Sequence, residues 1–237
     1  MRSKSQSKNG LILVALLTFC ASACAAPPPT SRPADGPGAG GPPPNLPPSL
    51  ATEKTLQSKT LDRAVTFHLY LPPGYEASGE RYPTVYWLHG SNGNSAMASR
   101  IVSGLFHRAM VSGNIPPAIV VFPDGMRQSM WVDSADGRVR MESFLVNDLL
   151  PHIDSAYRTR ATPDARVVEG GSMGGYGAAR LGLKYPERFG AVSMLSAGPL
   201  QPVLDPENAP IVGRKNAQQV LDTVYNGDPD VFHAQSP

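Results

Sequence analysis

The clearest alternation of apolar and polar residues falls within residues 56–72. One set of alternate positions is apolar and consists of Val65, Phe67, Leu69 and Leu71. A period of two residues is typical of a strand with one buried face, and the Pro-Pro-Gly sequence that follows is typical of a turn. We therefore expect two strands in residues 56–72, paired as an antiparallel hairpin at the edge of a sheet.

Shorter apolar runs farther along the chain predict buried strands at 84–88, 118–122, 166–168 and 191–195. Between them lie stretches with helical spacing at about 96–111, 142–157 and 176–184, the second of which we expect to be kinked at Pro151. Strands that alternate with helices favour an α/β fold, with a mostly parallel sheet and helices on both faces. Ligands bind at the carboxyl ends of such strands, which points to the loops 89–94, 123–135 and 170–175.

The first 23 residues have the pattern of a secretory signal peptide. Three basic residues precede an apolar run from Leu11 to Phe19, and Ala21-Ser22-Ala23 follows it. The run is shorter than the roughly 20 apolar residues that span a membrane. Cys24 comes next, a placement that resembles a bacterial lipobox. We expect an exported protein, periplasmic or at the cell surface, with a lipid on Cys24. Ordinary cleavage with an incidental Cys24 is the alternative.

Residues 24–52 are rich in Pro and Gly, which predicts an extended linker ahead of a domain at 53–237. Both cysteines of the chain, Cys20 and Cys24, precede this domain, so we expect no disulfide framework, no metal and no cofactor. Without the three basic residues of the signal peptide, 18 Lys and Arg nearly balance 19 Asp and Glu. Nucleic-acid binding requires a basic excess, so we expect no nucleic-acid partner.

The motif that carries chemistry is Gly170-Gly171-Ser172-Met173-Gly174, a match to G-x-S-x-G. It lies between a predicted strand and a predicted helix, which is the context of a nucleophile elbow. The turn is strained, so the residues two before and two after the serine must be small to let strand and helix approach each other. We therefore expect Ser172 to be a catalytic nucleophile, although a glycine-rich turn with an incidental serine is the alternative.

An acyl-transfer site also needs two N–H donors for the oxyanion. We expect them to be the backbone N–H groups of Met173, which follows the nucleophile, and of Ser91, in the loop after an earlier strand. His89 ends that earlier strand, and we expect it to have a structural role, because the base follows the nucleophile in chain order in this fold.

Several segments together resemble the esterase D-like group of α/β hydrolases. That group includes feruloyl and acetylxylan esterases, S-formylglutathione hydrolases, enterochelin esterases and mycolyltransferases. The matching segments are LPPGY at 71–75, YPTVYWLHG at 82–90, VVFPDG at 120–125, DLLPHIDSAY at 148–157, GSMGGYG at 171–177 and YPERFG at 185–190. The resemblance implies an α/β-hydrolase fold, Ser172 as nucleophile, and Ser91 and Met173 as oxyanion-hole residues. It also places Trp131 and Asp133 in a loop near the substrate, as residues that line the cleft.

Two features depart from the group. Glu169 precedes the elbow where a small or apolar residue is usual, so we expect it to be partnered, exposed or protonated. Members of the group also continue past the Ser-Pro at 236–237, through strands that carry the catalytic Asp and His. From this resemblance we expect the hydrolase domain to be incomplete at its C-terminal end. His233 is the one histidine after Ser172, and we expect it not to be the base.

These patterns predict a serine-dependent carboxylic ester hydrolase that acts through an acyl-enzyme. By resemblance its substrate is a small-molecule or polysaccharide ester, of the feruloyl, acetyl or siderophore kind. Two alternatives stay open: a non-catalytic protein of hydrolase fold that serves in binding, and an acyltransferase, which differs only in the acceptor. The predicted membrane contact is limited to the N-terminal lipid.

Overall fold

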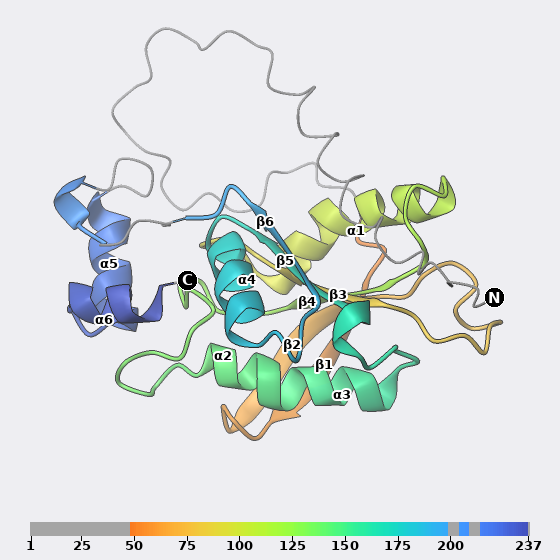
Figure 1. Ribbon diagram of the computed structural model, residues 1–237, viewed down its shortest axis with the longest axis horizontal. Coiled ribbons are helices and arrows are strands. Elements are labelled where there is room, and N and C mark those ends of the chain that lie inside the picture. Colours follow the sequence, from red (N-terminus) through yellow and green to blue (C-terminus); the bar gives the residue numbers. More distant parts are fainter. Residues whose placement is uncertain (1–47, 199–203, 209–213, 237) are drawn as a thin grey trace, which may run out of the picture.

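The computed structural model describes residues 48–198, 204–208 and 214–236. Six strands form one sheet in the order β1-β2-β4-β3-β5-β6, seen as the arrows at the centre of Figure 1. The strands are β1 (Thr52–Ser58), β2 (Arg63–Tyr70), β3 (Thr84–Leu88), β4 (Ile119–Pro123), β5 (Arg166–Gly171) and β6 (Ala191–Leu195). The predicted signal peptide, Cys24 and most of the predicted linker lie outside the described residues.

The sheet is mixed, and its parallel part holds the predicted site. β1 and β2 form the expected antiparallel hairpin, and β2 also runs antiparallel to β4. The strands β4, β3, β5 and β6 are mutually parallel, so their carboxyl ends meet at one edge. Each apolar run expected to be a strand forms one, within a few residues at its ends.

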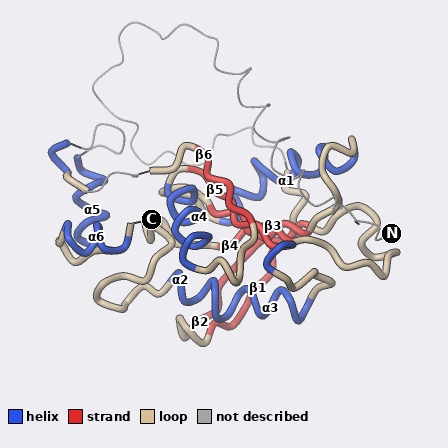
Figure 2. Tube along the Cα trace, in the orientation of Figure 1, coloured by secondary structure: helices blue, strands red, loops and turns tan. Residues whose placement is uncertain are grey.

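Helices cover both faces of the sheet (Figures 1 and 2). They are α1 (Ser95–Val111), α2 (Met141–Ser143), α3 (Leu150–Ala156), α4 (Met173–Lys184), α5 (Arg214–Val224) and α6 (Pro229–Gln235), with short 3₁₀ turns at 163–165 and 206–208. One core lies between α1 and the sheet and contains Val102, Phe106 and Val120. A larger core joins the other face to α2, α3, α4, α5 and α6. This is the α/β architecture that the sequence predicts.

The region of the expected kink at Pro151 is helical throughout, but part of it has a different winding. Residues 144–149 form a π-helical segment between α2 and α3, in which the Leu150 N–H donates to Leu145 O. Pro151 is the second residue of α3, which continues directly from this segment. A wider turn directly before a proline is one way for a helix to continue through it.

Strand β2 is buried on both faces near His68, whereas the alternation of apolar and polar residues predicts one buried face. His68, which alternates with the apolar residues, is only 7% exposed. The reason is that α1 covers this face, where the Ser95 hydroxyl lies 3.2 Å from His68 Nδ1. On the other face the ring of His152 in α3 contacts Phe67. In the residues that the structure describes, no helix is long and apolar enough to span a membrane.

Candidate active site

Ser172 lies in a sharp turn between β5 and α4. Its backbone has φ 55° and ψ −120°, in a region that residues with a side chain rarely adopt. The glycines of the motif permit this turn. A Cβ on Gly170 would lie 2.7 Å from Leu88 O, and a Cβ on Gly174 would lie 2.8 Å from His89 O. Ser172 is exposed, so its hydroxyl is accessible. This geometry is that of a nucleophile elbow.

Two backbone hydrogen bonds fix the elbow. The Ser172 N–H donates to Leu195 O of β6 at 2.9 Å, and the Ser172 carbonyl accepts from the Tyr176 N–H at 3.0 Å. Met173 is buried and is the first residue of α4. Its N–H belongs to the helical turn whose N–H groups have no partner within the helix, and the partial positive charge of that helix end favours an anion.

The loop after β3 lies against the elbow. A Cβ built on Gly90 would be 3.3 Å from Ser172 Cβ and 3.3 Å from Gly171 O, so the backbone of the two segments is in close contact. Ser91 follows in this loop and is exposed. The structure therefore brings together the three residues expected to act on a carbonyl group, Ser172, Met173 and Ser91.

The His89 ring is buried behind this loop, where both of its nitrogens bond to backbone atoms. Nε2 accepts from the Gly125 N–H at 3.0 Å, and Nδ1 lies 2.9 Å from Gly90 O. Because Nε2 is an acceptor, the proton of the neutral ring must be on Nδ1, which donates to Gly90 O. Burial lowers the pKa of His89 below its usual value, which keeps the ring neutral. The contacts agree with a structural role for His89.

The structure places Trp131 inside the core and gives it no accessible surface for a cleft. Its side chain is 0% exposed and its indole Nε1 donates to His89 O at 3.1 Å. Asp133 is half-buried, and it accepts from the Ser143 N–H at 3.0 Å and from the Ser143 hydroxyl at 2.5 Å. Both side chains therefore hold this loop in place. Trp131 packs on His89, and Asp133 forms hydrogen bonds to Ser143 of α2.

Glu169 lies on β5, three residues before Ser172, and is only 3% exposed. Ser193, its neighbour on β6, donates a hydrogen bond to the carboxylate at 3.3 Å. Burial raises the pKa of Glu169 to about 7, against a smaller lowering effect of the Ser193 hydrogen bond. Two of the expected outcomes therefore hold: the carboxyl group has a partner, and it is largely protonated below neutral pH.

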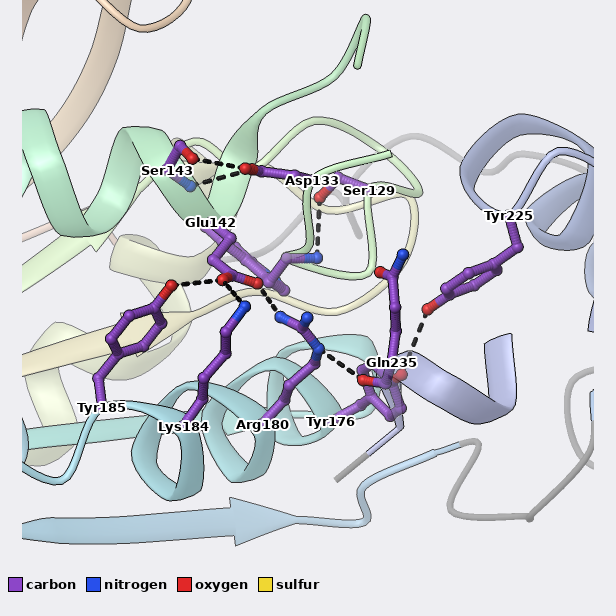
Figure 3. A network of polar contacts seen from close by, with 11 residues as sticks. Ser129, Asp133, Glu142, Ser143, Tyr176, Arg180, Lys184, Tyr185, Tyr225 and Gln235 are labelled. Carbon is purple, nitrogen blue, oxygen red and sulfur yellow. Dashed lines mark hydrogen bonds and ion pairs between the residues drawn. The ribbon is translucent and has the colours of Figure 1, made fainter. Parts of the chain in front are cut away.

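A buried polar network that the sequence analysis missed holds α4 in place (Figure 3). The Glu142 carboxylate, 4% exposed, accepts from the guanidinium of Arg180, from Lys184 Nζ at 2.5 Å and from the Tyr185 hydroxyl at 2.5 Å. Arg180 Nε also donates to Gln235 O at 2.6 Å, which links α4 to α6. The available signal was the spacing of Arg180 and Lys184, which are four residues apart and share a helix face.

Three other histidines have contacts away from the elbow. The rings of His68, His107 and His152 contact Ser95, Tyr70 and Phe67, respectively. His233 is exposed on α6, and its neighbour Phe232 packs on Tyr176 of α4. In the part of the chain that the structure describes, no hydrogen bond joins a histidine ring to Ser172, and no cluster of His, Cys, Asp or Glu could hold a metal ion.

Fold and elbow together define the chain as an α/β hydrolase. Its residues 58–232 match the family model described as "Putative esterase". The chain belongs to this esterase family.

Among the relatives of the chain, an esterase of Mycobacterium tuberculosis strain H37Rv is 37% identical over 129 residues, which is 53% of this chain and 27% of that protein. The endo-1,4-beta-xylanase/feruloyl esterase of Xylanibacter ruminicola is 32% identical over 166 residues, which is 65% of this chain and 22% of that protein. The chain thus spans about a quarter of the length of each relative.

Solved structures give the same picture of the fold. A ferulic acid esterase is 26% identical, with a TM-score of 0.61, and the match covers 76% of this chain and 69% of that one. An S-formylglutathione hydrolase of Agrobacterium tumefaciens is 23% identical, with a TM-score of 0.57, and the match covers 73% of this chain and 63% of that one.

Proposed function

We propose that the chain is a serine-dependent carboxylic ester hydrolase in which Ser172 forms an acyl-enzyme. The observation that carries this proposal is the strained backbone of Ser172, with φ 55°, at the start of α4 and against the loop that holds Ser91. Strain of this kind costs about 1–3 kcal/mol and persists where the surroundings over-determine it, typically in active sites. Here it presents an exposed hydroxyl beside two candidate N–H donors.

The chemistry follows from these positions. Ser172 Oγ attacks the ester carbonyl carbon. The carbonyl oxygen becomes negatively charged, and the N–H groups of Met173 and Ser91 stabilise it. The tetrahedral intermediate collapses, the alcohol leaves with a proton, and the acyl group stays on Ser172. Water then releases the acid. A general base must take the proton of Ser172 and return it to the leaving alcohol. We assign this step to none of His68, His89, His107 and His152, because their rings contact other groups.

The substrate class that we propose is an acyl ester of a hydroxyl-rich compound, namely a feruloyl or acetyl ester of a polysaccharide. The support is the likeness to the ferulic acid esterase structure and to the xylanase/feruloyl esterase. Siderophore esters share the same chemistry, and hydrolysis assays with feruloylated oligosaccharides, acetylated xylan and enterobactin distinguish these substrates.

The nucleophile is tested with a fluorophosphonate probe. We expect the full chain to be labelled at Ser172 and the Ser172→Ala variant to lose the label. Ser155→Ala, which removes an exposed hydroxyl on α3, is the matched control and should label as the wild type does. Labelling that persists in Ser172→Ala at another serine would contradict the assignment.

A second candidate function is binding without catalysis. It is favoured by the finding that no described histidine is bonded to Ser172. Under this alternative the chain binds an ester ligand, and neither turnover nor labelling at Ser172 occurs even after long incubation.

We also propose that the protein is exported and held at a membrane through a lipid on Cys24. The support is the order of a basic segment, an apolar run, small residues and Cys24 in the sequence.

A further inference from the structure

We propose that Trp131 is a positioning residue that aims the oxyanion-hole donor of Ser91, and that it acts through His89. This inference rests on the proposed function, because it concerns the same site. It replaces the expected contact of Trp131 with substrate by an indirect role.

The first step concerns the peptide group between Gly90 and Ser91. In a trans peptide the C=O and the N–H point in opposite directions in one plane. Gly90 O accepts from His89 Nδ1 at 2.9 Å and from the Gly93 N–H at 3.0 Å. These two donors fix the direction of the Gly90 carbonyl, and they therefore fix the direction of the Ser91 N–H on its other side.

The second step concerns the His89 ring, which must itself be held to act as a donor. The Gly125 N–H bonds to Nε2 at 3.0 Å, and the Trp131 ring lies edge-on to the imidazole with 5.0 Å between ring centroids. The indole Nε1 also donates to His89 O at 3.1 Å. Trp131 thus contacts both the ring of His89 and its carbonyl group, which belongs to the peptide preceding Gly90.

The third step concerns the backbone around Trp131, which is strained where it places this indole. Met130 and Trp131 are consecutive residues with positive φ, 56° and 58°, and both are buried. The Ser129 hydroxyl accepts from the Trp131 N–H at 3.1 Å and donates to Gly125 O. A Cβ on Gly125 or Gly177 would overlap the indole. Two residues with strained backbone and two glycines that leave room for the indole together indicate that its position matters for more than filling the core.

The decisive variant is Trp131→Phe, which keeps an aromatic ring and removes the indole donor. The matched control is Trp87→Phe on β3, which removes the same atoms from a tryptophan that contacts Phe122. In the full chain, the residual dipolar coupling of the Ser91 N–H bond reports its orientation without any need for turnover. We expect this coupling to change in Trp131→Phe and to stay at the wild-type value in Trp87→Phe.

A second pair of variants tests the route through His89. An asparagine amide can place a donor near the position of Nδ1, whereas a glutamine amide reaches toward Nε2. We therefore expect His89→Asn to keep the Ser91 N–H orientation more closely than His89→Gln. If both variants give the wild-type coupling, the route through His89 is wrong.

Kinetics supply the functional readout. We expect Trp131→Phe to lower kcat for p-nitrophenyl acetate about tenfold with little change in KM, because a misaimed donor loses stabilisation of the transition state. Trp87→Phe should leave kcat unchanged. A wild-type chain with neither turnover nor labelling at Ser172 contradicts the proposed function, and the Ser91 coupling then still decides the role of Trp131. An unchanged coupling in Trp131→Phe overturns the inference.

Discussion

The Ser193 hydroxyl of β6 donates its hydrogen bond to a carboxyl group, that of Glu169 on β5, which has almost no contact with solvent. Two register positions farther along the same strand pair, Gly171 is opposite Leu195, whose carbonyl holds the Ser172 N–H. Glu169 and Gly171, the residue before Ser172, therefore lie on the same strand pair. We expect the protonation state of Glu169 to affect the stability of this pair.

We predict that Glu169 contributes less to the stability of the protein as pH rises between about 4.5 and 7, whereas the lowered pKa of buried His89 acts in the opposite direction. The pKa of Glu169 is about 7 in the folded protein and 4.5 as the ordinary value. In this range the Glu169 carboxyl group is ionised in the unfolded chain but keeps its proton in the folded protein. The unfolded state therefore binds fewer protons, and it becomes relatively more stable as pH rises. The loss is complete above pH 7 and amounts to about 3 kcal/mol.

The measurement is urea unfolding at pH 5 and pH 8. Glu169→Gln can keep a partner for Ser193, and relative to this variant the wild type should lose about 3 kcal/mol of unfolding free energy between pH 5 and pH 8. Glu187→Gln removes an exposed carboxylate and should show the wild-type pH dependence. A Glu169→Gln variant with the wild-type pH dependence would show that another group titrates.

Gly174→Ala should destabilise the protein and remove labelling at Ser172. The added Cβ would lie 2.8 Å from His89 O and would also overlap Leu88 O, so β3 and α4 must separate. We expect a loss of about 1–3 kcal/mol, typical of overpacking in a tight core. Gly79→Ala is the control, because no atom lies within 4 Å of its added Cβ. Equal melting temperatures of the two variants would contradict the tight packing at the elbow.

Arg180→Met should lower the unfolding free energy by about 3–5 kcal/mol, because it leaves the buried Glu142 carboxylate without its guanidinium. Arg188→Met is a suitable comparison, since the Arg188–Glu187 pair is exposed and 3.8 Å apart. We expect it to change stability little. Chemical denaturation of both variants measures the difference, and a near-neutral Arg180→Met would mean that Lys184 and Tyr185 suffice for Glu142.

The chain of 237 residues should hydrolyse p-nitrophenyl acetate only slowly, because none of the described histidines is bonded to Ser172. The oxyanion hole alone still accelerates such reactions about 10³–10⁴-fold over water, so a small Ser172-dependent rate is expected. His233→Ala should leave this rate unchanged. Rapid turnover that disappears in His233→Ala would instead make His233 the base.

Cys24 should carry a lipid in cells that export the protein. Mass spectrometry of the membrane fraction should show a mature N-terminus at an acylated Cys24, and Cys24→Ala should move the protein to the soluble fraction. A soluble wild-type protein that begins at an unmodified Cys24 would contradict the anchor.

The strands could be predicted closely because each is a short apolar run bounded by turn residues, such as 84–88 before His89-Gly90. The start of α4 could not. The sequence analysis places it near Tyr176, whereas the helix begins at Met173. Glycine is a poor helix former, so the Gly174-Gly175 pair does not predict a helical turn. The structure has glycine in this turn because β3 approaches so closely that a Cβ on Gly174 would clash with it.

The strained turn at Ser172 was accessible to sequence analysis because a local motif, G-x-S-x-G, encodes it. The role of Trp131 was not. Its burial depends on space left by Gly125 and Gly177, and its hydrogen bond reaches His89, 42 positions earlier in the chain. Neither relationship has a local spacing that a pattern could reveal. In the Glu142 network the spacing of Arg180 and Lys184 is local, but their partner Glu142 lies far away in the sequence.

The burial of Trp131 also gives the site an optical signal of its own. The chain has two tryptophans, one enclosed against the His89 ring and the other, Trp87, half-exposed on the opposite side of the sheet. A shielded indole emits at shorter wavelength than a hydrated one, and a protonated imidazole in contact quenches its emission. In a Trp87→Phe background, fluorescence would therefore follow the opening of the loop behind Ser91, and the titration of His89, separately from the unfolding of the rest of the molecule.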